Sequence, residues 1–188
     1  MNYSTDFATV NLILKSSLET RTVDAFTLSL IKSEKQIRRI FTFLIFQHNS
    51  YSLEDYISLR KALAKNKKVY FNGFINGINL ILPKTLKEIY GQDYDKDFHY
   101  LIEFTKDRNK IFHGQITEKG LSREDLIKRI EHIKKWCKTL GDNIKNEIGY
   151  DGFSDSFKKS SLELTLNNLN KFDTIDNYKL FIKKELER

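Results

Sequence analysis

The chain has 188 residues, a formal net charge of +7 and a pI near 9.3. Its single cysteine, Cys137, has no second cysteine for a disulfide or a shared zinc site, which excludes a disulfide scaffold and indicates a reducing, cytoplasmic setting. One proline and eight glycines are few helix breakers for this length, so the composition predicts one all-α domain over residues 1–188.

The N-terminal residues, MNYSTDFATVNLILKSSLET, place no basic segment before their short apolar run. No apolar run in the chain reaches the roughly 18 residues of a membrane span, so we expect neither an export signal nor a membrane partner. Residues 22–48 then carry apolar side chains near helical spacing, which predicts a long core helix. Its run IFTFLIF, taken alone, also fits a strand.

Residues 51–68 predict a shorter helix with a basic end, because Ser52 stands three positions before Asp55, as in a capping box. Residues 69–83 follow and stop at Pro83. One face of that segment carries asparagines beside glycines at i, i+4, namely Asn72, Asn76, Asn79, Gly73 and Gly77. Such a face predicts either a close helix crossing within the chain or a docking face for a partner protein.

The net charge is concentrated in one segment. Between Tyr56 and Lys87 there is no acidic residue, and the seven basic residues there equal the whole formal charge of +7: Arg60, Lys61, Lys65, Lys67, Lys68, Lys84 and Lys87. A basic patch of this kind attracts polyanions, although a solvated lysine-rich surface gives the same pattern.

Residues 94–112 predict a helix, since an apolar series recurs at helical spacing and Gly114 stands where a glycine commonly ends a helix. The series comprises Phe98, Leu101, Ile102, Thr105 and Phe112.

Ser122 with Asp125 predicts the start of another long helix. Its apolar positions are Leu126, Ile130, Ile133, Cys137, Leu140, Ile144 and Ile148.

Residues 151–188 are predicted as a C-terminal helical extension. The stretch SLELTLNNL (161–169) alternates like a strand, but its leucines also fit a helix, and the helical surroundings favour the helix. The stretch IDNYKLFIKKELER (175–188) predicts a terminal amphipathic helix.

Motifs for common enzyme chemistry are missing from the sequence. It has no phosphate loop of the GxxxxGK[ST] or GxGxxG type, no GxSxG nucleophile motif and no metal-ligand spacing among its four histidines, so we expect no cofactor and no metal.

The remaining candidate for chemistry is the segment RNKIFH (108–113). Arg108 offers a permanently charged fork for phosphate oxygens, and His113 can give or take a proton near neutral pH. Together they could cleave RNA without a metal.

Arg108 and His113 could also have purely structural roles. Arg108 could pair with Glu103, Asp107 or Glu124, and His113 could cap its helix. On an ideal helix the two side chains point about 140° apart, so they converge only if the helix end is distorted or if a second chain completes the site.

The segment RNKIFH, with Asn109 directly after the arginine and a long helix on either side, resembles the HEPN superfamily, whose signature is R-x4-6-H with a polar residue after the arginine. The motif match covers residues 108–113, and a looser match of helix order extends over about 20–150. The resemblance implies a bundle of four or five main helices, with additional terminal helices, that pairs as a homodimer with two arginines and two histidines in one cleft. Many members are metal-independent endoribonucleases of toxin–antitoxin systems or abortive phage defence.

By resemblance, Arg108 binds the scissile phosphate, His113 moves protons and Asn109 positions the pair, leaving 2′,3′-cyclic phosphate and 5′-hydroxyl ends. Glu103 and Asp107 would offset the paired arginines. The RNA backbone would be held by Lys106, Lys110, Arg60, Lys61, Lys65, Lys67 and Lys68. An antitoxin or regulatory protein is a possible further partner. The alternative is a non-catalytic HEPN-like domain that binds RNA, a nucleotide or a protein.

Overall fold

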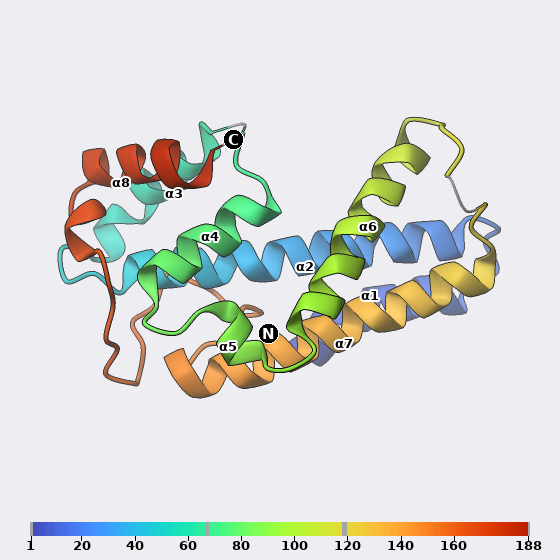
Figure 1. The fold of residues 1–188 in the computed structure, drawn as a ribbon, viewed down its shortest axis with the longest axis horizontal. Helices are drawn as coiled ribbons and strands as arrows, with labels where there is room; N and C mark the ends of the chain where they lie inside the picture. The colour runs from blue at the N-terminus through green and yellow to red at the C-terminus, as the bar shows by residue number, and fades with distance from the viewer. Residues whose placement is uncertain (1, 67, 118–119, 188) are drawn as a thin grey trace.

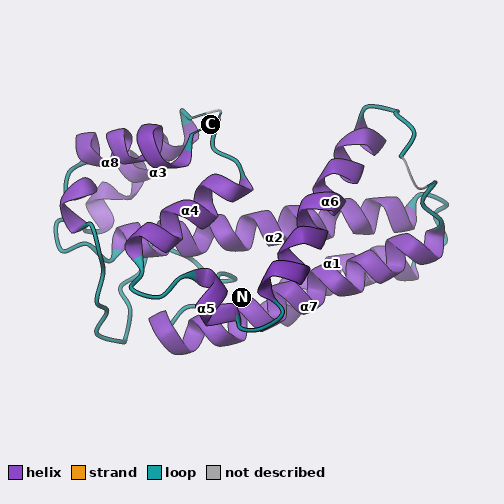
Figure 2. Cartoon of the chain, viewed as in Figure 1, coloured by secondary structure: helices purple, strands orange, loops and turns teal. Residues whose placement is uncertain are grey.

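The computed structural model describes residues 2–66, 68–117 and 120–187, and within them the chain is all-α, as predicted (Figures 1 and 2). The α-helices are α1 (Tyr3–Lys15), α2 (Arg21–Phe46), α3 (Tyr56–Ala64), α4 (Phe71–Ile81), α5 (Leu86–Tyr90), α6 (Tyr94–Phe112), α7 (Arg123–Ile148) and α8 (Ile175–Phe181). Two 3-10 turns, η1 (Leu53–Asp55) and η2 (Leu169–Lys171), and a π-helical turn, η3 (Ile182–Leu186), complete the fold. In the described residues, no helix has both the length and the hydrophobicity of a membrane span.

Helix α2 forms the centre of the bundle. It lies against α1, α7 and α4, and in Figure 1 it runs beside α1 and α7 along the long axis of the molecule. Its inward positions, including Phe26, Ile37 and Phe41, are fully buried. Burying one such side chain stabilises the fold by about 1.5–3 kcal/mol, which is why this 26-residue helix holds together without a side-chain N-cap. The predicted core helix is therefore confirmed.

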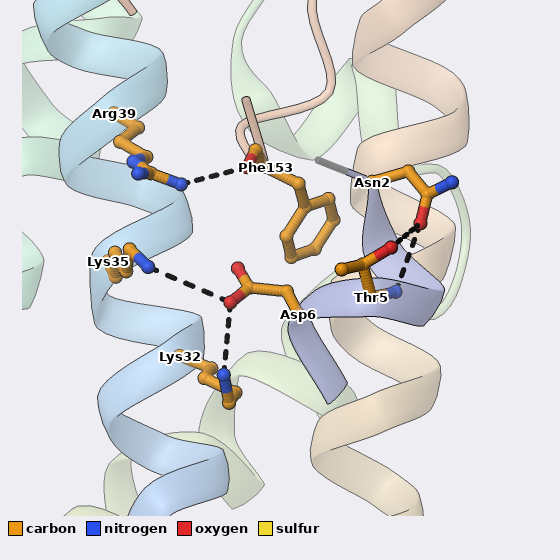
Figure 3. A network of polar contacts seen from close by, with 7 residues as sticks. All are labelled: Asn2, Thr5, Asp6, Lys32, Lys35, Arg39 and Phe153. Carbon is orange, nitrogen blue, oxygen red and sulfur yellow. Dashed lines mark hydrogen bonds and ion pairs between the residues drawn. The ribbon is translucent and has the colours of Figure 1, made fainter. Parts of the chain in front are cut away.

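Helix α1, which is not among the helices predicted from the sequence, is fixed to α2 by charge as well as by packing. The Asp6 carboxylate is almost completely buried and lies 3.0 Å from Nζ of Lys32 and 3.6 Å from Nζ of Lys35 (Figure 3). Beside them, Phe7 and Val10 are buried in the core. A buried carboxylate needs such partners, because an unpaired one would be costly to desolvate.

The glycine and asparagine face of α4 makes a close crossing within the chain, and the structure places the chain's own C-terminal turn on it. A Cβ built on Gly73 would lie 2.2 Å from the carbonyl oxygen of Leu186. The Asn76 side chain donates a hydrogen bond of 2.8 Å to the carbonyl oxygen of Glu185. Of the two interpretations, the internal crossing is confirmed, and this face is not open to a partner protein.

Local capping signals are confirmed, and so is the predicted terminal helix, which is formed by α8 and η3, whereas the helix predicted at 161–169 is wrong. Ser52 and Ser122 each form the predicted capping box, at the start of η1 and of α7. Residues 161–168, however, contain no helix, and Figure 2 draws most of the chain between α7 and α8 as loop. Asn168 explains part of this, because its side chain donates to the carbonyl oxygen of Leu80 at the end of α4, which holds the loop in place.

Helix α6 carries the candidate residues and leaves the bundle as it proceeds. Its first turns pack inward through Tyr94, Leu101 and Phe104, while its C-terminal end projects away from α7 (Figure 1). Phe112, predicted to continue the apolar stripe, is instead 64% exposed. The loop from α6 to α7 begins at this projecting end.

Candidate functional site

Arg108 lies in a groove of about 350 Å³ between α6, the start of α4 and α2. Its Nη2 is 3.1 Å from Oε1 of Glu34 on α2, and its Nε donates a 3.0 Å hydrogen bond to Oδ1 of Asn109. The Arg108 side chain is only 15% exposed. The guanidinium is thus held in a fixed orientation by two oxygens, with its remaining N–H groups available for an anion.

Glu34 is the residue that sequence reasoning missed. The structural interpretation of Arg108 expected an ion pair with Glu103, Asp107 or Glu124. The ion pair is present, but its acid is Glu34, which stands 74 positions earlier in the chain. No local pattern marks Glu34, since its relation to Arg108 exists only once α6 has packed across α2.

The two expected supporting acids have other neighbours. Asp107 forms an ion pair with Arg129 of α7, and the Arg129 guanidinium lies 4.7 Å from the centroid of the Phe104 ring. This contact ties α6 to α7. Glu103 lies 3.9 Å from Nε2 of His99, one helical turn earlier. Neither acid therefore faces Arg108 within one chain.

His113 ends α6 and faces solvent. Gly114 takes a left-handed conformation with φ of 65°, and the N–H of Gln115 donates to the carbonyl oxygen of Lys110 at 2.8 Å. These bonds are those of a Schellman motif, so the predicted glycine stop is confirmed. The His113 side chain is exposed and, within the described residues, its imidazole has no hydrogen-bonding or ionic partner.

One chain brings together only part of the predicted site. Lys106, Arg108 and Asn109 line the same groove, whereas His113 does not. The helix end is not distorted in a way that turns His113 back toward Arg108. Lys110 is partly buried near the helix end and lies outside the groove as well.

The predicted basic segment is spread over α3 and the turn after it. Arg60, Lys61, Lys65 and Lys68 are exposed, and Lys67 lies outside the described residues. Arg60 donates a 2.8 Å hydrogen bond to the hydroxyl of Tyr56 and borders a second groove, beside α2.

Other residues that could carry chemistry are part of the core. Burial lowers the pKa of His132, whose Nε2 lies 3.3 Å from Oδ1 of Asp97. Burial also raises the pKa of the Cys137 thiol, which is fully enclosed. Trp136 is completely buried. Among the described residues, no group of three or more His, Cys, Asp and Glu side chains has the arrangement of a metal site.

Comparisons with protein-family models, with curated proteins and with solved structures return no match.

Proposed function

We propose that the protein is an endoribonuclease of the HEPN type that acts as a homodimer without a metal ion. The observation that carries this proposal is the end of α6, where an arginine oriented by Glu34 and Asn109 lines a groove and an exposed histidine follows at the C-cap. A fixed guanidinium and a free imidazole are the groups that phosphodiester cleavage at a 2′-hydroxyl requires.

The reaction needs two proton transfers. A neutral His113 imidazole accepts the proton of the 2′-hydroxyl while the 2′-oxygen forms a bond to phosphorus. The bond from phosphorus to the 5′-oxygen breaks, and that oxygen takes a proton from the protonated His113 of a second copy. Arg108 stabilises the charge on the non-bridging oxygens. The products are a 2′,3′-cyclic phosphate and a 5′-hydroxyl.

A second copy supplies what one chain lacks, since His113 does not line the groove of Arg108. The surface near the site favours such pairing, because it exposes large apolar side chains: Tyr70 is 60%, Phe112 64% and Ile116 90% exposed. Covering them with a second copy removes apolar area from water. Glu34 offsets the charge of Arg108, which makes the approach of two arginines less costly.

The activity is tested with labelled single-stranded RNA in EDTA. We expect the wild-type protein to cleave it to cyclic-phosphate ends, and Arg108→Ala and His113→Ala each to lose at least about a hundredfold in rate, as is typical for removing a charge-stabilising or proton-transferring group.

Matched controls are available in the same chain. His99→Ala removes an exposed histidine from α6, and Arg123→Ala removes an exposed arginine from the start of α7. Both controls should cleave like wild type. Absence of wild-type cleavage, or equal cleavage by all five proteins, would refute the ribonuclease proposal.

The second candidate is a non-catalytic HEPN-like domain that binds RNA or a nucleotide. It is favoured by the ion pair between Arg108 and Glu34 and by the separation of Arg108 from His113 within one chain. Binding of the labelled RNA by the wild-type protein without cleavage would support this second candidate. Action in toxin–antitoxin systems or phage defence, with an antitoxin partner, stays a prediction of the family resemblance.

A further inference from the structure

A second groove, of about 570 Å³, is lined by Asn66 and Val69, whereas Tyr70 lines the groove of Arg108. It is bounded by α2, α3 and the loop at 155–157. Four cationic side chains line it, and Asp155 is its only carboxylate among the described residues: the cations are Lys35, Arg38, Arg39 and Arg60. Three of these four cations are not in the basic segment recognised from the sequence.

The cations are held by neighbours that leave them able to bind an anion. Arg39 donates a 2.8 Å hydrogen bond to the carbonyl oxygen of Phe153, as Figure 3 shows, and Lys35 lies 3.6 Å from Oδ1 of Asp6. Arg60 is held by its bond to the Tyr56 hydroxyl. A guanidinium has five N–H donors, so one such bond orients it and leaves most donors unused.

Arg38 is the least committed cation of the groove. Its side chain is exposed, and within the described residues its guanidinium has no hydrogen-bonding or ionic partner. Asp155 is also exposed, and its Oδ1 already accepts the N–H of Phe157 at 3.1 Å. The field inside the groove is therefore positive.

Aromatic rings form part of the wall. The rings of Tyr56 and Phe157 are perpendicular with centroids 4.5 Å apart, and both side chains are partly exposed. Leu59 and Phe74 lie beneath them. Cations next to accessible aromatic faces are the combination that holds a nucleic-acid strand, since phosphates bind the cations and bases stack on the rings.

We propose that this second groove binds single-stranded RNA away from the reaction centre. The inference rests on the proposed function, because it takes RNA as the ligand. The two grooves border successive residues, with Glu34 and Tyr70 in the first and Lys35 and Val69 in the second. The two grooves are therefore near each other along α2 and at residues 69–70.

The test measures binding of a labelled single-stranded 2′-O-methyl RNA, which lacks the free 2′-hydroxyl that cleavage uses. Arg38→Glu and Arg60→Glu should each raise Kd on the order of tenfold. Each should also make binding less dependent on salt: in a plot of log binding constant against log salt concentration, the magnitude of the slope should fall by roughly 0.7 for each phosphate that the variant no longer neutralises. The control Lys145→Glu reverses an exposed lysine outside the groove and should bind like wild type. Circular dichroism shows whether each variant is folded, and Arg38→Gln provides a milder change at the same position.

The outcomes separate this inference from the ribonuclease proposal. Groove-dependent binding without any cleavage of unmodified RNA supports the groove and refutes only the enzyme. Equal binding by Arg38→Glu, Arg60→Glu and Lys145→Glu, or no binding by the wild type, overturns the groove. A nucleoside monophosphate that binds as tightly as the RNA also overturns it, because the site would then be a nucleotide pocket.

Discussion

In the proposed ribonuclease, an RNA phosphate would replace the contact between Arg108 and Glu34. The two side chains are 15% and 35% exposed, so their ion pair is partly buried, and a phosphate that replaces Glu34 must compensate Arg108 for the lost pairing. A phosphate offers Arg108 two oxygens in a bidentate geometry that is at least as favourable. Glu34 therefore orients the arginine without blocking it.

His132 gives the fold a defined response to pH. Burial lowers its pKa from the ordinary 6.5, an effect that the carboxylate of Asp97 partly opposes. The unfolded chain then binds a proton more readily than the folded one, so His132 lowers the free energy of unfolding as pH falls below about 6.5 and has no such effect above it. His132→Gln should weaken this loss of stability between about pH 7 and 5.

Urea denaturation across that pH range measures the effect, with His99→Gln, an exposed histidine of α6, as the control. If the free energy of unfolding changes with pH in the same way for wild type and for His132→Gln, His132 is not a source of the pH dependence.

At the scale of elements, the crossing of α4 with η3 depends on the absence of a side chain at one position. Gly73→Ala would place a methyl group 2.2 Å from the carbonyl oxygen of Leu186, and backbone there cannot move without displacing the C-terminal turn. We expect a loss of about 1–3 kcal/mol in the free energy of unfolding, as for other overpacked sites.

Asn76→Ala is the matched comparison on the same helix, because it removes one hydrogen bond and adds no atoms. Its cost should be about 0.5–1.5 kcal/mol. A Gly73→Ala protein as stable as wild type in urea denaturation would show that the crossing is looser than the structure indicates.

Elements with local signals were predictable, and those fixed by distant contacts were not. The bounds of α6 and α7 follow from Gly114 and from the Ser122 capping box, which act within a few residues. The loop at 161–168 is set by Asn167 and Asn168, whose N–H and amide groups bond to carbonyl oxygens of residues 80–82 at the end of α4. The leucine pattern of residues 161–169 gives no information about hydrogen-bond partners that stand more than eighty positions away in the sequence.

The residues of the candidate site also fall into those with a local signal in the sequence and those fixed by distant contacts. The motif identified Arg108, Asn109 and His113, because side-chain chemistry and spacing are written in the sequence. It did not identify Glu34, nor the arginines of α2 that line the second groove, since both depend on how helices pack. Asp107 was expected to offset the charge of the arginines, and its ion pair with Arg129 of α7 was likewise not predictable, because it too depends on how helices pack.

At the scale of the whole molecule, the projecting end of α6 is the region that the proposed homodimer would cover. It exposes Phe112, His113 and Ile116. A bundle gains little stability from extending a helix beyond its core, and in the proposed homodimer a second copy would pack against this projecting end.

The measurement that tests this account most directly combines sedimentation with RNA cleavage for the variant Phe112→Glu/Ile116→Glu. Both side chains are exposed in one chain, so the monomer should stay folded, while two charges at the interface should prevent pairing. Leu12→Glu, which charges an exposed leucine on α1, is the control. The account predicts a dimeric, RNA-cleaving wild type and control and a monomeric, inactive double variant. A monomeric double variant that cleaves RNA at the wild-type rate would contradict it.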